Sequence, residues 1–286
     1  PLAHASDGGG SIRLPAAVHG LVGFKPSAGV TASAYPAPSD MTRLVSDHCV
    51  TRTVRDSFSF FCTTTGYAGN LAEPGRLRIG WYTDDAFGVA VDEEGLAAVE
   101  HARQLCEAAG HYVRPVAPPP IEGPAISTAF FDLASAGIHE VEAMLTPMLG
   151  RSLAPSDVEP FTWALHQRIQ GRPKARDRAL SILEDQGKRF AGFLSEFDVV
   201  LSPTLGGPRP GLGHLAPHLP ADVLRLRTNR LAGYTAIHNP AGACAVSLPL
   251  HWTKEGLPVG AQFAAQKGQD ALLFNLAAQL EAVSPW

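Results

Sequence analysis

The chain has 286 residues, of which 45% are hydrophobic and 17% are charged, and its formal net charge is −4. This balance is typical of a folded globular protein, and it excludes a disordered chain and a strongly basic nucleic-acid-binding surface. No apolar run is long enough to span a bilayer. The cysteines are scattered with no CxxC pair, which favours a reduced, cytoplasmic protein; they are Cys49, Cys62, Cys106 and Cys244.

The predicted elements begin with a short buried strand over residues 1–5, which leads into a glycine-rich turn. Pro15 opens a helical turn over 16–19, and Gly20 closes it, as expected for proline near a helix start and glycine after its end. A small apolar strand follows over 21–24. Residues 27–46 are rich in Ser, Ala and Pro and are expected to form an ordered surface loop.

A helix over 54–65 and a β-α-β unit come next. The unit consists of a strand over 77–82, a helix that begins at the N-cap Asp92 and ends at Gly110, and a returning strand over 112–116. Because the connection is a helix, we expect the two strands to be parallel. Residues 125–196 are predicted to be mostly helical, with breaks near Pro147, Pro155, Pro160 and Pro173.

The last third of the chain predicts further strands and one more helix. Its segments are a buried strand over 197–201, a loop over 206–220, a hairpin of 245–250 and 259–263, and a helix over 270–283. Strands and helices alternate along the whole chain. The sequence therefore predicts an α/β protein with a mixed β-sheet flanked by helices.

Three glycines, Gly8, Gly9 and Gly10, stand directly before Ser11. A phosphate-binding loop is disfavoured, because neither the lysine of a P-loop nor the long helix of a dinucleotide loop follows Ser11. Consecutive glycines allow several backbone N–H groups to point the same way beside a hydroxyl nucleophile, an arrangement that suits acyl transfer. A tight structural loop with an incidental serine is the alternative on local composition.

The motifs of this chain, taken in order, resemble the amidase signature family. Residues 6–16, which include Ser-Asp-Gly-Gly-Gly-Ser, and residues 20–27 resemble the second half of the signature. The segments that continue the resemblance are 51–56, 77–80, 197–204, 239–242, 256–262 and 277–281. The sequence of the loop, together with His48 before Thr51-Arg52-Thr53, is most similar to the branch of the family that includes the 6-aminohexanoate cyclic dimer hydrolases.

This resemblance implies hydrolysis of the C–N bond of linear or cyclic amides by a Ser-cisSer-Lys triad, with no metal and no organic cofactor. Ser11 matches the acylated nucleophile. Gly8, Gly9, Gly10 and Ser11 match the loop whose N–H groups form the oxyanion hole. Asp7 and Arg13 match the charged pair of the motif, and they are expected to support the loop without taking part in the chemistry.

The family places the bridging serine and the lysine upstream of the nucleophile, and the ten residues before Ser11 contain neither. We therefore expect residues 1–286 to be the C-terminal part of a single amidase domain, with 121–195 as a variable helical segment that shapes the substrate site. The expected partners are a small-molecule amide and either the missing N-terminal segment or another copy of the chain in a homo-oligomer. No nucleic acid or membrane is expected.

Two other functions stay open: a catalytically silent amidase fragment that lacks the base, and an amidotransferase subunit that passes ammonia to a partner. Within the chain, Lys25 occupies a structural Lys-Pro position of the family, and His4 and His19 have no family role. The eleven histidines show no HExxH spacing, so the sequence predicts no metal site.

Overall fold

The computed structural model describes residues 1–32 and 42–286. Within these residues, one mixed sheet of eight strands runs through the molecule in the order β1-β3-β2-β7-β8-β6-β4-β5. Its strands are β1 (Leu2–Asp7), β2 (Val22–Lys25), β3 (Ser46–Thr51), β4 (Arg78–Trp81), β5 (Tyr112–Pro115), β6 (Val199–Pro203), β7 (Cys244–Trp252) and β8 (Pro258–Ala265). The mixed sheet and its flanking helices confirm the predicted fold class.

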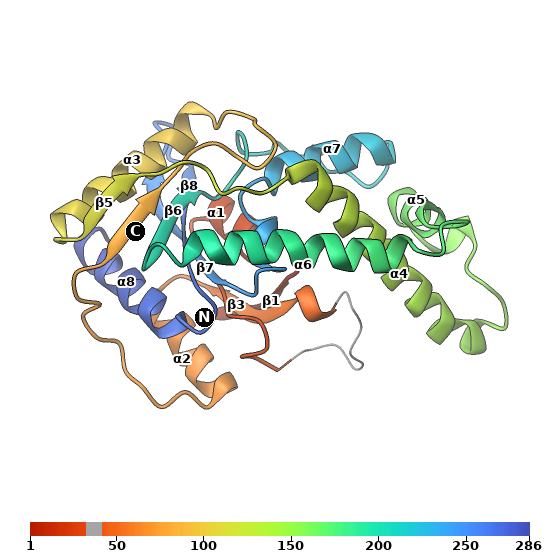
Figure 1. Cartoon of the computed structure of the whole chain (residues 1–286), viewed down its shortest axis with the longest axis horizontal. Helices are drawn as coiled ribbons and strands as arrows, with labels where there is room; N and C mark the ends of the chain where they lie inside the picture. Colours follow the sequence, from red (N-terminus) through yellow and green to blue (C-terminus); the bar gives the residue numbers. More distant parts are fainter. Residues whose placement is uncertain (33–41) are drawn as a thin grey trace.

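Helices cover both faces of this sheet (Figure 1). The α-helices are α1 (Arg13–His19), α2 (Val54–Thr65), α3 (Glu93–Ala108), α4 (Gly123–Leu149), α5 (Pro160–Arg168), α6 (Ala175–Leu194), α7 (Ala221–Leu231) and α8 (Asp270–Val283). Short 3₁₀-helices are η1 (Thr42–Leu44), η2 (Pro155–Asp157) and η3 (Ala236–His238). None of the helices in the described ranges has the length and apolar content needed to cross a membrane.

Two hydrophobic cores lie on opposite faces of the sheet, and the alternation of strand side chains separates them. In β7, Val246 and Leu248 face the core that contains α2, α3 and α8, whereas Ala245 faces the core that contains α4 and α6. Figure 1 shows α6 lying across the sheet and α4 with α5 extending away from it. The molecule is therefore a three-layer α/β/α arrangement with a helical projection.

Several predicted elements are confirmed. Strands β4 and β5 are parallel neighbours joined through α3, and β7 and β8 form the predicted antiparallel hairpin. Helices α2 and α8 have the predicted bounds. The predicted breaks near Pro155, Pro160 and Pro173 separate η2, α5 and α6. The four cysteines are free.

Other predictions were wrong. Helix α4 continues through Pro147 and ends two residues later at Leu149, so this proline stands in the last turn instead of marking the end of the helix. Strand β1 is at the edge of the sheet, and its first residues are exposed instead of buried. Strand β3 and helix α7 were not predicted at all. Of the predicted loop over 27–46, residues 33–41 lie outside the described residues.

Helix α1 sits directly on the sheet because small residues face it. A side chain at Gly23 of β2 would overlap Ala16, and one at Gly260 of β8 would overlap Ala17. This close approach fixes the start of α1, and with it the turn that carries Ser11, over the junction of strands that are distant in the sequence.

Candidate active site

The Gly-Gly-Gly-Ser turn connects the end of β1 to the start of α1. Gly10 has a φ of 130°, a conformation that only glycine adopts readily. A Cβ atom at Gly10 would also overlap the side chain of Thr235, within 2.9 Å of the Thr235 Cβ atom. The third glycine of the run is therefore required both by backbone conformation and by packing.

Asp7 and Arg13 form a fully buried ion pair across this turn, with Asp7 Oδ1 3.0 Å from Arg13 Nη2. The Asp7 carboxylate also accepts hydrogen bonds from the backbone N–H of Gly10 at 2.7 Å and of Ile12 at 3.2 Å. Burial alone raises the pKa of Asp7, but the charge and hydrogen bonds of Arg13 outweigh it, so this pKa lies well below its usual value. Asp7 is thus ionised, and it holds the backbone N–H groups of the residues directly before and after Ser11.

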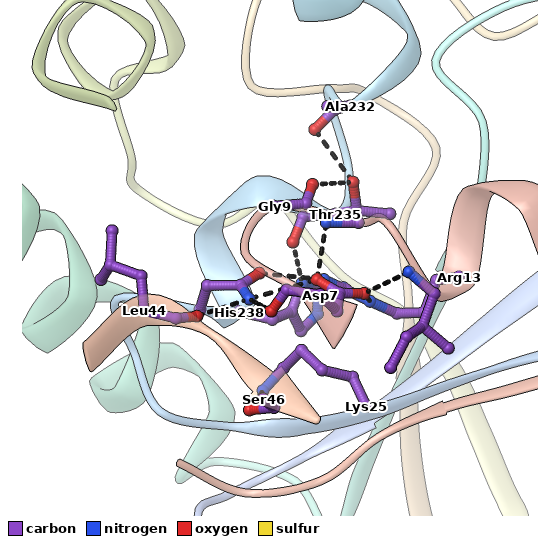
Figure 2. Close-up of polar contacts among 12 residues, drawn as sticks. Asp7, Gly9, Arg13, Lys25, Leu44, Ser46, Ala232, Thr235 and His238 are labelled. Carbon is purple, nitrogen blue, oxygen red and sulfur yellow. Dashed lines mark hydrogen bonds and ion pairs between the residues drawn. The ribbon is translucent and has the colours of Figure 1, made fainter. Parts of the chain in front are cut away.

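Two residues from the C-terminal part of the chain complete this support. Asn239 donates to the Asp7 carbonyl oxygen at 2.7 Å and accepts from Arg13 at 3.0 Å. Gln262 on β8 accepts from Arg13 Nη1 at 2.9 Å. Figure 2 shows Asp7 at the centre of these contacts, with Arg13 beside it. The buried guanidinium is therefore held by three side chains, as a charge inside a protein requires.

The peptide unit between Gly9 and Gly10 is held at both of its polar ends. Thr235 donates its hydroxyl hydrogen to the Gly9 carbonyl oxygen at 2.7 Å, and Asp7 accepts from the Gly10 N–H (Figure 2). Since the C=O and N–H of a trans peptide point in opposite directions, these two bonds fix the orientation of that peptide plane. Because the Gly10 N–H already donates to Asp7, it is not available as an oxyanion donor. Of the predicted donors, the N–H groups of Gly8, Gly9 and Ser11 are left.

Those three N–H groups have no hydrogen-bond acceptor among residues 1–32 and 42–286. Ser11 is exposed, and with Gly8 and Gly9 it lines a cavity of about 310 Å³. The turn thus places the candidate nucleophile and residues with unengaged backbone N–H groups on one cavity wall, as a candidate oxyanion site requires.

The other walls of the cavity are mainly apolar and come from distant parts of the chain. Helix α4 contributes Ile126, Phe130 and Phe131, and the remaining apolar side chains include Leu14, Phe87 and Ile237. Polar groups are few: Ser127 of α4 donates to Asn229 of α7 at 2.8 Å, and both line the cavity. A site of this kind holds an apolar group and orients it with a small number of hydrogen bonds.

The basic residues considered as substitutes for the family base do not line this cavity. Lys25 is buried and donates to the Pro26 carbonyl oxygen at 2.8 Å, and burial lowers its pKa to about 8. His4 is exposed, 3.4 Å from Asp47, and His19 contacts the carbonyl oxygen of Pro15. The structure therefore brings Asp7, Arg13 and the turn over 8–11 together. Lys25, His4 and His19 lie outside the cavity.

Sequence reasoning missed several residues of the site. Asn239 and Gln262 lie in segments that resemble family motifs, so the sequence marked these segments as important. It did not indicate that either side chain contacts Arg13. Thr235 and Asn229 carried none, because their partners are more than a hundred residues away in the sequence.

Comparison with known proteins gives a consistent result. The model of the Amidase family matches residues 1–274. The protein named "Putative amidase AmiC" of Mycobacterium leprae is 34% identical over 305 residues, covering all of this chain and 63% of its own length. The 6-aminohexanoate-cyclic-dimer hydrolase of Pseudomonas sp. (strain NK87) is 29% identical, covering all of this chain and 64% of its own length.

A solved structure of 6-aminohexanoate cyclic dimer hydrolase complexed with substrate superposes with a TM-score of 0.88 at 26% sequence identity. The match covers all of this chain and 65% of that one. The chain therefore spans a little under two thirds of the length of the relatives it matches. With the family model matching almost from end to end, this chain belongs to the amidase family.

Proposed function

We propose that the protein hydrolyses the C–N bond of a small-molecule amide through an acyl-enzyme on Ser11. The observation that carries this proposal is the position of Ser11 and of the free N–H groups of Gly8 and Gly9 on the wall of one cavity. Membership in the amidase family supports the same reaction.

In the proposed reaction, Ser11 Oγ attacks the amide carbonyl carbon and forms a C–O bond. The electron pair of the C=O bond moves to the oxygen, which the N–H groups of Gly8, Gly9 and Ser11 stabilise. The tetrahedral intermediate collapses, the C–N bond breaks, and the amine leaves with a proton. Water then attacks the ester, releasing the carboxylic acid and restoring the Ser11 hydroxyl. Each preorganised donor contributes about two to three powers of ten in rate.

A base must take the proton of Ser11 as it attacks, because a serine hydroxyl is otherwise a weak nucleophile. We propose that a Ser-cisSer-Lys relay does this, with the bridging serine and the lysine supplied from the upstream part of a longer amidase. In this proposal, residues 1–286 are the C-terminal part of one domain, and 121–195 is the substrate-shaping segment. The cavity-lining residues of α4 support the latter role.

The proposed substrate carries an apolar acyl or amine group, since the cavity walls are mainly apolar. The relatives named acylamidase and 6-aminohexanoate-cyclic-dimer hydrolase bear names of amide-cleaving enzymes, which agrees with this class. The rings of Phe130 and Phe131 would contact that group, while Ser127 and Asn229 would orient a polar atom.

A fluorophosphonate probe tests the nucleophile. In the upstream-extended protein, labelling should reach Ser11 and disappear in Ser11→Ala, while Ser6→Ala serves as the matched control because Ser6 lines the same cavity. Labelling that persists unchanged in Ser11→Ala would refute the assignment. The site of attachment is read by mass spectrometry of the digested protein.

The source of the base needs a separate comparison, between the 286-residue chain and a version extended upstream. Amide hydrolysis only in the extended protein supports the relay proposal, whereas equal hydrolysis by both contradicts it. Measurable amide hydrolysis by the 286-residue chain alone would also refute the alternative of a catalytically silent fragment that lacks the base. Size-exclusion chromatography with light scattering on the same samples tests for a homo-oligomer, and co-purification with a partner subunit tests the amidotransferase alternative.

A further inference from the structure

A second group of reactive side chains lies on the helical projection, apart from the Ser11 turn. His139 and Glu142 are three residues apart on α4, so they lie on the same face of that helix. His166 of α5 meets them, and one potential ligand atom from each of the three residues lies within 4.8 Å of the others. None of the three lines the Ser11 cavity.

The Glu142 carboxylate is the centre of this group. Its Oε2 atom is 2.7 Å from His166 Nε2 and 3.6 Å from His139 Nδ1. Its Oε1 atom accepts a hydrogen bond from the backbone N–H of Leu153 at 3.0 Å. One oxygen is thus held by the backbone, and the other is presented to both imidazoles.

The surroundings hold this arrangement in place. His166 is buried, with 6% of its surface exposed, and Trp163 stacks on it at 4.8 Å between ring centroids. Asp132 of α4 pairs with Arg168 of α5 at 2.7 Å, which joins the same two helices about two turns before His139 on α4. The cluster is therefore built on rigid helices, as a precise ligand site requires.

His166 also has a polar atom that the protein leaves unsatisfied. Its Nδ1 atom is buried and finds no hydrogen-bond partner in the described part of the chain. A buried imidazole with one nitrogen unsatisfied is uncommon, because each unmet hydrogen bond has a cost. Glu142 meets the other ring nitrogen, Nε2, so the unpaired Nδ1 is a separate feature of the ring, and it is the burial of His166 that distinguishes the group from an ordinary surface ion pair.

We propose that His139, Glu142 and His166 bind a divalent transition-metal ion of the zinc class. Imidazole nitrogen with carboxylate oxygen suits Zn²⁺, Co²⁺ or Ni²⁺, whereas Mg²⁺ and Ca²⁺ prefer oxygen ligands alone. In a tetrahedral zinc site, bond lengths near 2.1 Å separate ligand atoms by about 3.4 Å. The His139–Glu142 distance already agrees, and a small rotation of the Glu142 side chain would open its contact with His166.

The role of this site is to fasten α5 to the distal half of α4. The proximal half of α4 lines the Ser11 cavity, so an ion here would stiffen the segment that shapes that cavity. The ion takes no part in the proposed amide chemistry. The site stands or falls independently of the role of Ser11.

Isothermal titration calorimetry of the EDTA-treated, dialysed 286-residue chain with Zn²⁺ tests the site, and the absorption spectrum of the Co²⁺ form reports on the ligands. We expect one ion per chain and a higher melting temperature with Zn²⁺ than without. Loss of one ligand in His166→Ala or Glu142→Gln should weaken binding roughly tenfold or more and abolish the rise in melting temperature. Titration with Mg²⁺ should give no comparable heat.

Two further variants keep the test decisive. His139→Gln changes a half-exposed ligand, so it should weaken binding even if replacing the buried His166 prevents folding. His218→Ala removes an exposed histidine outside the cluster and should bind as tightly as the parent chain. Zn²⁺ binding with equal affinity in the parent, His139→Gln and Glu142→Gln chains would overturn the proposal, as would the absence of binding in the folded parent.

Discussion

Thr235 and Gly9 are 226 residues apart in the chain, yet the Thr235 hydroxyl donates to the Gly9 carbonyl oxygen at 2.7 Å. This bond and the one from the Gly10 N–H to Asp7 hold a single peptide plane from opposite sides. The directions of the neighbouring N–H groups depend on that plane. Thr235 is thus a positioning residue for the turn that carries Ser11.

In the upstream-extended protein, Thr235→Val should slow fluorophosphonate labelling of Ser11 by roughly tenfold while lowering the free energy of unfolding by only about 1 kcal/mol. Valine keeps the shape of threonine but cannot donate, so the peptide plane loses one of its two anchors. Thr235→Ser restores the donor and should recover most of the labelling rate. If Thr235→Val labels as fast as the parent, the peptide orientation does not depend on this bond.

Asp7→Asn should destabilise the fold strongly, by about 3–5 kcal/mol, because it leaves the Arg13 charge buried without its counter-ion. Urea denaturation followed by circular dichroism measures the change. Glu184→Gln is the matched control, since it breaks a solvent-exposed Glu–Lys pair on α6 and should leave the free energy of unfolding almost unchanged. Equal effects of the two substitutions would contradict a supporting role for the Asp7–Arg13 pair.

His48 should make the fold sensitive to acid. It is buried among the rings of Phe24, Phe60 and Phe274, and burial lowers its pKa from 6.5 to about 3. The unfolded chain therefore binds a proton between these two pH values that the folded chain does not. The stability from keeping His48 neutral is complete above pH 6.5 and is lost progressively as the pH falls towards 3.

The variant His48→Phe removes this titration and keeps an aromatic ring in the cluster. Between pH 6 and 4 the free energy of unfolding should fall less steeply for the variant than for the parent. The two slopes should differ by about 1.4 kcal/mol per pH unit, the value for one proton. The lost contact with Ser57 shifts stability by a constant amount and leaves the slope unaffected. Denaturant titrations across this range give the slope, and parallel curves for the two proteins would disagree with the prediction.

Phe130→Ala should weaken the use of amides with a large apolar group, with kcat/KM falling roughly tenfold or more. The Phe130 ring lies against Gly9 at the cavity wall, so its removal takes apolar contact away next to the turn that carries Ser11. Hydrolysis of a short substrate such as acetamide should change little. Met148→Ala, on the same helix but exposed to solvent, should leave the hydrolysis of both substrates unaffected; all variants are compared in the upstream-extended protein that the proposal requires.

Much of the fold follows from local sequence. Regular spacing of apolar residues, interrupted by turn or cap residues, predicts the β4-α3-β5 unit, the β7–β8 hairpin and helix α8. Each of these elements could therefore be predicted from a short stretch of sequence. Strand β3 was not predicted because its sequence is polar, although the strand is almost wholly buried. It pairs with β1 along its length and with β2 at its last two residues, and Ser57 contacts the His48 side chain.

The candidate active site likewise combines local features that the sequence predicts with long-range contacts that it does not. The glycines and Ser11 are contiguous, and the pairing of Asp7 with Arg13 spans only six residues, so the candidate nucleophile, its candidate donors and the ion pair that supports the turn lie within one short motif. The anchors Thr235 and Asn239, the cavity wall from α4 and the meeting of His139 with His166 join residues far apart along the chain. Such contacts exist only after the helices pack, because no local spacing encodes which faces will meet.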